Sequence, residues 1–172
     1  MNVRAIPLTT AAYRDYGDVI SADRDDVDDK DANQGTAKRR DWLAELANTR
    51  THARPNIASF RCTPRTEWPM KLALLEKHPC STQVFVPMNA RRYVVLVAKG
   101  GETPDLATLR AFVASPTQGV TYRPGVWHHP MIALDAPTDF AVLVWEDGSA
   151  DDCITVDLSA HGVTIELEGG VP

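Results

Sequence analysis

Residues 74–98 read LLEKHPCSTQVFVPMNARRYVVLVA and contain two runs typical of β-strands. The runs are TQVFVPM (82–88) and YVVLVA (93–98), and both are rich in the β-branched and aromatic residues that strands favour. Pro87 and Asn89 lie where the first run ends, as is common before a turn. This stretch therefore predicts two short strands separated by turn residues.

The same pattern continues on both sides of this stretch. Short apolar runs follow one another, and Gly, Pro, Asn and Asp separate them, which is typical of an all-β sandwich or barrel. The further expected strands are NIASFRC (56–62), GVTY (119–122), DFAVLVW (139–145), CITVDL (153–158) and GVTIEL (162–167).

Helical signals are fewer. Residues 9–16 (TTAAYRDY) begin with two threonines that can cap a helix, and Gly17 suits the position after its end. RDWLAELAN (40–48) predicts a helical turn or two. The clearest helix is expected after Thr103 and Pro104, because apolar residues then recur at helical spacing, at Leu106, Leu109, Phe112 and Val113. The expected fold is mainly β, a single barrel with two or three flanking helices.

Length and composition limit the classes of protein to consider. The chain has 172 residues, of which 44% are hydrophobic and 24% charged, as in one soluble globular domain spanning residues 1–172. The net charge is −5 and basic residues are scattered, which argues against nucleic acid as a partner. No apolar window is long enough for a membrane-spanning helix. The acidic stretch at 21–34 is expected to be a solvated or partly disordered loop.

The cysteines indicate a reducing compartment. Cys62, Cys80 and Cys153 form an odd set without a CxxC pair, and no signal peptide is recognisable, so a cytoplasmic location is expected. Cys80 lies two residues from His78, which leaves a Cys-His nucleophile as an alternative, although no third orienting group is evident. Glycine-rich phosphate-binding loops are missing from the sequence.

Two short segments carry the candidate chemistry. Glu76 and His78 are two residues apart, so on a strand both side chains point to one face, and Gln83 follows five residues later. His128 and His129 are consecutive, so in an extended segment only one of them faces a cavity. The combination of carboxylate, imidazole and amide groups predicts a small polar site.

Both segments resemble the motifs of the cupin superfamily of small barrels. The spacing of Glu76, His78 and Gln83 is similar to the first cupin motif, H-x-H-x(3,4)-E, with Glu and Gln in place of its first and last residues. Gly125 stands three residues before His128, as in the second motif. The resemblance implies four converging side chains that could hold a divalent metal: Glu76, His78, Gln83 and His128.

A longer similarity points to one family. Glu76-Lys77-His78-Pro79, Thr82-Gln83, Phe85 and Pro87-Met88 resemble a signature of the ureidoglycolate lyases, formerly called ureidoglycolate hydrolases. Similar segments follow in the family's order along nearly the whole chain: PLTTAAYRDYGDVI (7–20), ANQGTAKR (32–39), NIASFRC (56–62), YVVLVA (93–98), PDLATLRAFVA (104–114) and QGVTYRPGVWHHP (118–130). One departure is Trp145-Glu146, where family members often have a basic residue.

The resemblance implies cleavage of (S)-ureidoglycolate to glyoxylate and urea in allantoin and purine degradation. It implies His128 or His78 as general base, Glu76 as orienting group or acid, and a cofactor that is at most a divalent metal such as nickel. Substrate contacts are expected from Gln83, Arg61, Lys71 and His129. A homodimer is expected, and the alternatives are another cupin activity on a small hydroxy or keto acid, or a non-catalytic cupin that binds one.

Overall fold

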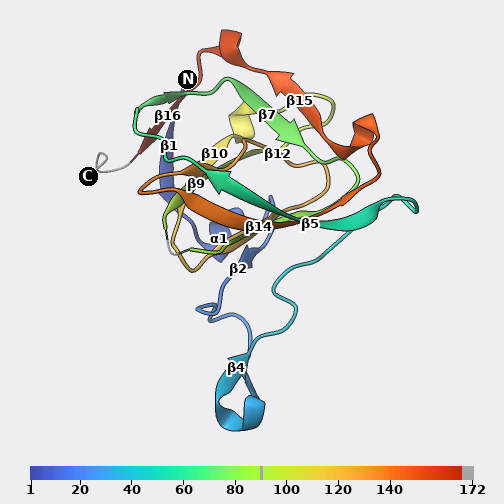
Figure 1. Ribbon diagram of the computed structural model, residues 1–172. Helices are drawn as coiled ribbons and strands as arrows, with labels where there is room; N and C mark the ends of the chain where they lie inside the picture. Colours follow the sequence, from blue (N-terminus) through green and yellow to red (C-terminus); the bar gives the residue numbers. More distant parts are fainter. Residues whose placement is uncertain (90, 168–172) are drawn as a thin grey trace.

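The computed structural model describes residues 1–89 and 91–167, and their secondary structure is almost entirely β (Figure 1). The prediction of a mainly β fold is confirmed. The strands are β1 (Asn2–Pro7), β2 (Val19–Ile20), β3 (Lys30–Ala32), β4 (Ala37–Arg39), β5 (Arg54–Cys62), β6 (Met70–Lys71), β7 (Leu74–Lys77), β8 (Gln83–Pro87), β9 (Tyr93–Ala98), β10 (Arg110–Ala114), β11 (Gly119–Tyr122), β12 (Trp127–His128), β13 (Ile132–Ala133), β14 (Thr138–Glu146), β15 (Ile154–Asp157) and β16 (Thr164–Leu167).

Two sheets form the body of the molecule. A nine-stranded sheet has the order β15-β7-β12-β9-β10-β1-β16-β6, with β13 also paired to β9, and a five-stranded sheet has the order β2-β11-β8-β14-β5. Every strand expected from the sequence is present, and the runs at 93–98 and 119–122 coincide with β9 and β11. The pairing of β7 with β12 places the two candidate motifs next to each other.

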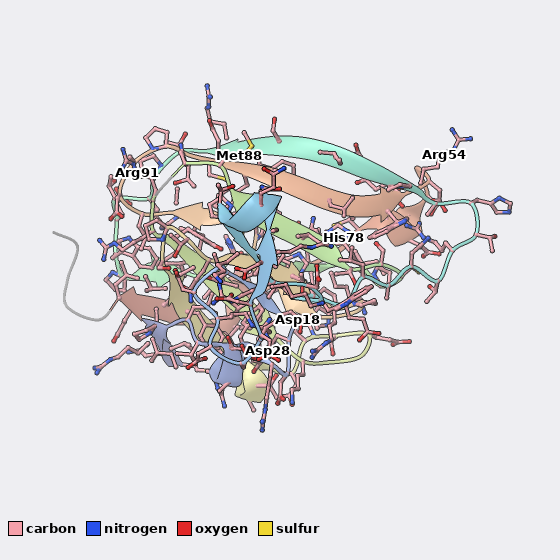
Figure 2. All side chains as sticks on the ribbon, turned by 90° about the horizontal axis from the view of Figure 1, so that it is seen from below. Asp18, Asp28, Arg54, His78, Met88 and Arg91 are labelled. Carbon is pink, nitrogen blue, oxygen red and sulfur yellow. The ribbon has the colours of Figure 1, made fainter. Side chains whose placement is uncertain are left out.

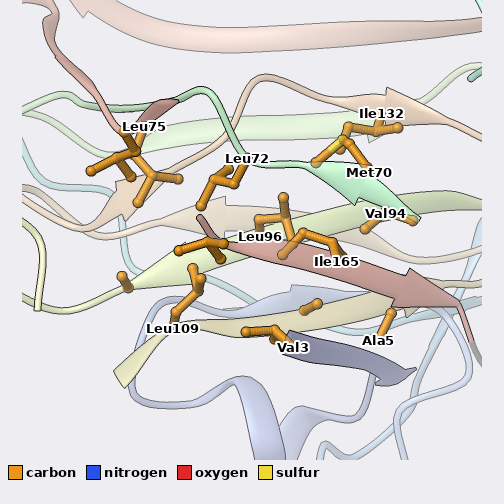
Figure 3. Packing of buried hydrophobic residues seen from close by; sticks show 14 of the residues in the cluster. Val3, Ala5, Met70, Leu72, Leu75, Val94, Leu96, Leu109, Ile132 and Ile165 are labelled. Carbon is orange, nitrogen blue, oxygen red and sulfur yellow. The ribbon is translucent and has the colours of Figure 1, made fainter. Parts of the chain in front are cut away.

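The central strand β9 is buried on both faces, so the molecule has two apolar cores. Val94, Leu96 and Ala98 pack into one cluster, and Figure 3 shows Val94 and Leu96 beside Met70, Leu72 and Ile165 of the same cluster. Tyr93, Val95 and Val97 pack into the other, which also contains side chains of the five-stranded sheet. This arrangement explains why β9 reads as a continuous apolar run instead of alternating with polar residues.

The prediction of a helix after Thr103 and Pro104 is wrong. The chain makes a short 3-10 turn at Leu106–Thr108, where Asp105 accepts a hydrogen bond from the Ala107 N–H, and then enters β10. Strand β10 is paired on both edges, with β9 and with β1, so its backbone groups are satisfied without a helix. Its two faces enter different cores, which places apolar residues at intervals that imitate helical spacing.

The other two helical predictions also change in the structure. Helix α1 covers only Thr10–Tyr13, with Thr9 as its cap through a 3.2 Å hydrogen bond from the Ala12 N–H. Residues 40–48 contain no helix, and Trp42 has a positive φ of 59°, which interrupts any helical turn. The described residues therefore contain short helical turns where two or three flanking helices were expected.

The acidic stretch has no helix or strand over residues 21–29, and its last residues enter a hairpin. Residues 30–39 form a two-stranded hairpin of β3 and β4 that extends away from the body of the molecule (Figure 1). Ion pairs support it, including Lys38 with Asp31 and Lys30 with Asp41. Among the described residues no helix has the length and apolar character needed to cross a membrane. Cys62, Cys80 and Cys153 are free thiols, in agreement with the sequence prediction.

Candidate functional site

Neighbouring strands bring three of the predicted side chains together. His128 on β12 is directly paired with Glu76 on β7, and His78 follows the end of β7 on the same face as Glu76. The potential ligand atoms of these three side chains all lie within 4.8 Å of one another. Both histidines are buried, and Figure 2 shows His78 within the body of the molecule, whereas Arg54 and Met88 lie at its periphery.

The ring of His128 is held in a fixed orientation. It stacks on Tyr122 with 3.9 Å between ring centroids and 5° between planes, and the His78 ring lies 5.6 Å away on a nearly parallel plane. Its Nδ1 lies 3.0 Å from the main-chain oxygen of Val126, which can only accept a hydrogen bond. The proton of a neutral His128 therefore resides on Nδ1, and the lone pair of Nε2 faces the cluster.

His78 has the same arrangement. Its Nδ1 donates a 2.6 Å hydrogen bond to the main-chain oxygen of Asp152, so its Nε2 also presents a lone pair. Neither Nε2 atom has a hydrogen-bond partner among the described residues, and the same is true of the buried Oε1 of Gln83. Gln83 is paired with Tyr122 across strands β8 and β11, which places it beside the ring that stacks on His128.

These unpaired atoms indicate a ligand site. A buried polar atom without a partner costs on the order of 1–3 kcal/mol, so proteins normally pair such atoms. Here three of them occur on neighbouring elements, next to a carboxylate. The site therefore offers acceptor atoms to a bound metal ion or to the hydroxyl and N–H groups of a small substrate.

Glu76 is ionised at neutral pH. Burial raises the pKa of its carboxyl group, but the nearby imidazole of His128 and then that of His78 outweigh burial, and the net pKa lies below the usual value. Its Oε1 is 3.5 Å from Nε2 of His128, and the Cys153 thiol approaches Oε2 at 3.9 Å. Burial and the Glu76 charge raise the pKa of Cys153 to about 11, so this thiol stays protonated.

Burial also keeps His78 and His129 neutral. Desolvation lowers the pKa of His78, and the adjacent His128 lowers it further, against the opposing effects of the Asp152 carbonyl and Glu76. Desolvation likewise lowers the pKa of His129, whose Nδ1 contacts the carbonyl oxygen of Pro130 at 2.6 Å. The neutral form of His78 has a free lone pair at Nε2 for a proton or a metal ion.

The donor set of Glu76, His78 and His128 fits a divalent transition metal. Two imidazole nitrogens and one carboxylate oxygen, all on one side, are common ligands of such ions and leave coordination positions open. The hydrogen bonds at both Nδ1 atoms orient the imidazoles as they do in known metal sites. Glu76, His78 and His128 therefore form a group that could bind a metal ion.

Two residues expected to contact the substrate are exposed to solvent. Arg61 is mostly exposed and forms a bidentate ion pair with Asp139, with distances of 2.7 and 2.9 Å. Lys71 is exposed on β6, at the end of the nine-stranded sheet. No hydrogen bond joins Cys80 to His78 among the described residues, because Nδ1 of His78 is used by Asp152 and its Nε2 has no partner. The nucleophile alternative is therefore not supported.

Other residues at the site were not identified from the sequence. Tyr122 stacks on His128, and Cys153 contacts Glu76, although both lie in predicted strands. The contact from Asp152 uses a main-chain oxygen, which carries no signal in the side-chain pattern. Tyr122 and Val120 lie two residues apart on β11, so both side chains point to the same face, and both pack in the second core. Alternation along this strand, six residues before His128, is therefore a signal that could have identified Tyr122.

Comparison with known proteins gives consistent results over nearly the whole chain. The family model described as ureidoglycolate lyase matches residues 1–166. The chain is 38% identical to the ureidoglycolate lyase of Salmonella paratyphi B, over 94% of this chain and 97% of that protein. It is 38% identical to the Saccharomyces cerevisiae ureidoglycolate lyase, over 96% and 98% of the two chains. The corresponding Escherichia coli protein is 39% identical, over 89% and 92%.

Solved structures with a related arrangement are more distant. A TDP-quinovose 3,4-ketoisomerase from Campylobacter jejuni aligns with a TM-score of 0.45 and 13% identity, over 80% of this chain and 91% of that one. A 3,4-ketoisomerase from Helicobacter canadensis aligns with a TM-score of 0.43 and 15% identity, over 80% and 89%. The family assignment rests on the full-length sequence matches, which show that this chain belongs to the ureidoglycolate lyase family.

Proposed function

We propose that this chain cleaves (S)-ureidoglycolate to glyoxylate and urea. The observation that carries the proposal is the set of three buried, unpaired polar atoms, Nε2 of His78, Nε2 of His128 and Oε1 of Gln83, beside the Glu76 carboxylate. The membership of the chain in the ureidoglycolate lyase family supports the choice of substrate.

The reaction needs one proton removed and one delivered. The substrate carries a hydroxyl and a ureido group on the same carbon, next to a carboxylate. Loss of the hydroxyl proton allows the C–O bond to become a carbonyl while the C–N bond breaks, and the departing urea nitrogen takes up a proton. No water is consumed, so the site has to move protons and hold the substrate.

The geometry suggests how these roles are divided. His78 is neutral at pH 7 because burial lowers its pKa, and its Nε2 lone pair is available to accept the hydroxyl proton. Glu76 and His128, whose Oε1 and Nε2 atoms lie 3.5 Å apart, together deliver the proton to the departing urea nitrogen. The amide oxygen of Gln83 accepts a hydrogen bond from the ureido N–H groups.

A divalent ion, nickel or a similar metal, is part of the proposal as an optional cofactor. Glu76, His78 and His128 would hold it, and Gln83 would add a weaker neutral oxygen. When bound, the ion supplies a Lewis acid that polarises the substrate hydroxyl. Tyr122 and the carbonyl oxygens of Val126 and Asp152 fix the imidazoles in the orientation that either version of the site requires.

Incubation with ureidoglycolate tests the proposal directly. Glyoxylate, urea and ammonia are quantified separately, and equimolar glyoxylate and urea without ammonia are expected. His128→Ala should remove most of the turnover in a protein that remains folded, whereas the matched change of the exposed His52→Ala should leave turnover unchanged. Ammonia in place of urea would contradict the lyase reaction, and binding without turnover would favour a non-catalytic cupin.

Chelation tests the metal separately. In the metal-dependent version of the site, removal of bound metal lowers turnover and addition of nickel or a similar ion restores it, with the metal content measured alongside. Full activity in metal-free protein would refute the metal-dependent version and leave the lyase activity intact.

We also propose that the chain forms a homodimer. Strand β5 is an edge strand of the five-stranded sheet and carries Ile57, which is 80% exposed, and Phe60, which is 45% exposed. Open edges with exposed apolar side chains commonly pair with another chain. Light scattering of the purified protein should give twice the mass of the chain, and a monomer at assay concentration would contradict the proposal.

A further inference from the structure

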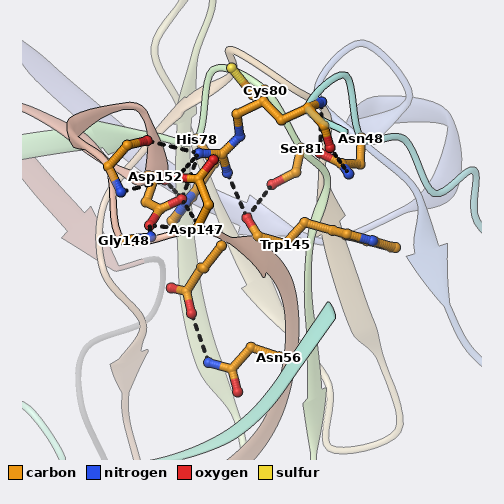
Figure 4. A network of polar contacts seen from close by, with 12 residues as sticks. Asn48, Asn56, His78, Cys80, Ser81, Trp145, Asp147, Gly148 and Asp152 are labelled. Carbon is orange, nitrogen blue, oxygen red and sulfur yellow. Dashed lines mark hydrogen bonds and ion pairs between the residues drawn. The ribbon is translucent and has the colours of Figure 1, made fainter. Parts of the chain in front are cut away.

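A network of polar contacts meets the Nδ1 side of the His78 ring. It is built on the connection between β14 and β15, residues 147–153, which includes the 3-10 turn Ala150–Asp152. This connection supplies the main-chain oxygen of Asp152 that accepts the hydrogen bond from Nδ1 of His78 (Figure 4). The position of that oxygen decides which nitrogen of His78 faces the site.

The Asp152 side chain folds the connection into one shape. Its carboxylate accepts hydrogen bonds from the main-chain N–H groups of Asp147, at 3.0 Å, and Gly148, at 2.7 Å (Figure 4). Gly148 has a positive φ of 82°, which a glycine adopts without strain. The same residue therefore closes the turn with its side chain and contacts His78 with its main chain.

Arg50 connects this turn to the rest of the protein. Its Nη1 lies 2.7 Å from the Asp152 carboxylate and 3.0 Å from that of Asp147, and its Nη2 donates a 2.9 Å hydrogen bond to the carbonyl of Trp145. Only 14% of the Arg50 side chain is exposed. A partly buried guanidinium with two carboxylate partners is a strong and directional support, because the planar fork fixes several acceptors at once.

The backbone around Arg50 is tied to the segment that follows His78. The Asn48 side chain makes hydrogen bonds to both the N–H and the carbonyl of Arg50. The Thr49 N–H donates to the carbonyl of Cys80 at 2.9 Å, and Asn48 forms an isolated bridge with Ser81. Arg50 thus joins the chain just after His78 to the turn that holds the His78 ring.

We propose that Arg50 is a positioning residue for His78, acting through Asp152. The guanidinium holds the turn so that the Asp152 carbonyl keeps the proton of His78 on Nδ1 and leaves the Nε2 lone pair in the site. This role deepens the proposed lyase function, and the expected effect on kcat rests on that function. Arg50 itself contacts neither the Glu76 carboxylate nor the His128 ring in any interaction that the described residues show.

Arg50→Met removes the guanidinium and keeps a side chain of similar length. Loss of a group that orients a site histidine typically costs about 10- to 100-fold in activity, and we expect a fall of that size in kcat with little change in KM. Correlation spectra of ¹⁵N-histidine-labelled protein should show His78 as the Nδ1–H tautomer in the original protein and as a mixture of tautomers in the variant.

Arg92→Met is the matched control. Arg92 also forms a bidentate pair, with Asp135 at 2.7 and 3.0 Å, but it lies outside the network. Its replacement should leave kcat and the His78 spectrum unchanged. An unchanged kcat in folded Arg50→Met, or a lost kcat with His78 still entirely in the Nδ1–H form, would overturn the proposal.

Two milder variants keep the proposal testable when Arg50→Met does not fold. Arg50→Lys retains one positive charge without the fork and should recover part of kcat and part of the single-tautomer spectrum. Asp152→Asn keeps the main-chain carbonyl but weakens the pair with Arg50, and should also populate a second tautomer of His78. A single His78 tautomer in both variants would refute the role of Arg50. If the unmodified protein does not cleave ureidoglycolate, the proposed function fails, while the spectra still decide the positioning role.

Discussion

Gly17 should not tolerate even a methyl group, and the reason lies next to the candidate site. A Cβ at this position would lie 1.8 Å from the main-chain oxygen of Thr121 and 2.7 Å from its carbonyl carbon. The two segments would have to separate by roughly 1.5 Å to reach ordinary van der Waals contact. Thr121 immediately precedes Tyr122, whose ring stacks on His128.

The energetic cost follows from what holds these segments together. Overpacking of a rigid interior typically costs about 1–3 kcal/mol. Separation also strains the buried hydrogen bond from the Tyr13 hydroxyl to the Thr121 carbonyl, at 3.0 Å, and the one from the Asp18 N–H to the Thr121 hydroxyl, at 2.9 Å. Each such bond contributes about 1 kcal/mol. We therefore expect Gly17→Ala to lower the free energy of unfolding by about 3–5 kcal/mol.

Urea and thermal unfolding measure this change, with Gly101→Ala as control. A Cβ on Gly101 would meet no atom within 4 Å, and this residue does not have a positive φ. The control should therefore stay within about 0.5 kcal/mol of the original protein. For a chain of this size each kcal/mol corresponds to roughly 2–4 °C in Tm, so a loss of about 4 kcal/mol lowers Tm by about 8–16 °C. Equal stability of the two variants would refute the close approach of Gly17 and Thr121.

Three further predictions concern the site, the core and a surface pair. Tyr122→Leu should lower kcat by up to about 100-fold, because it removes the ring that fixes His128. Tyr122→Phe keeps the ring and should retain most of the activity, so equal kcat values in the two variants would contradict the prediction. Leu75→Ala should cost about 2–5 kcal/mol in urea unfolding, since this side chain is fully buried, and a cost below about 1 kcal/mol would contradict its packing. The hydrogen bonds from Arg92 lower the pKa of Asp135, so the pair stabilises the fold above the unfolded pKa of about 3.9 and loses this effect as pH falls through the lower folded pKa. Asp135→Asn should therefore lower the free energy of unfolding by at most about 1 kcal/mol at pH 7, because the pair is partly exposed. This difference in stability from the original protein should vanish at low pH, and a difference that persists at pH 2 would contradict the prediction.

The sequence predicted the strands well because their pattern is local. Runs such as 93–98 and 119–122 are apolar and bounded by turn residues, and they coincide with β9 and β11. The helix expected after Thr103 failed because β10 has both faces buried in different cores, so its apolar residues do not alternate. Periodicity shows which residues are buried, but it cannot distinguish one buried face from two.

The site was predictable only in part, for a related reason. The spacing within two short segments predicts Glu76, His78 and His128, and the structure brings these three together. Arg61 is a candidate because the substrate carboxylate needs a cationic partner. In the structure its cross-strand neighbour Asp139 already pairs with the Arg61 guanidinium. The contact of Arg50 with Asp152 joins residues about a hundred positions apart, and no local pattern indicates it.

The two-sided burial of β9 has a consequence for how the protein unfolds. Every side chain from Tyr93 to Ala98 is at most 1% exposed, and the strand contributes alternate residues to both cores. Neither core can lose its packing without exposing the backbone that supports the other, so the two should melt as one cooperative unit. The amide hydrogens of β9 should accordingly exchange with solvent only through global unfolding, as the slowest class in the molecule.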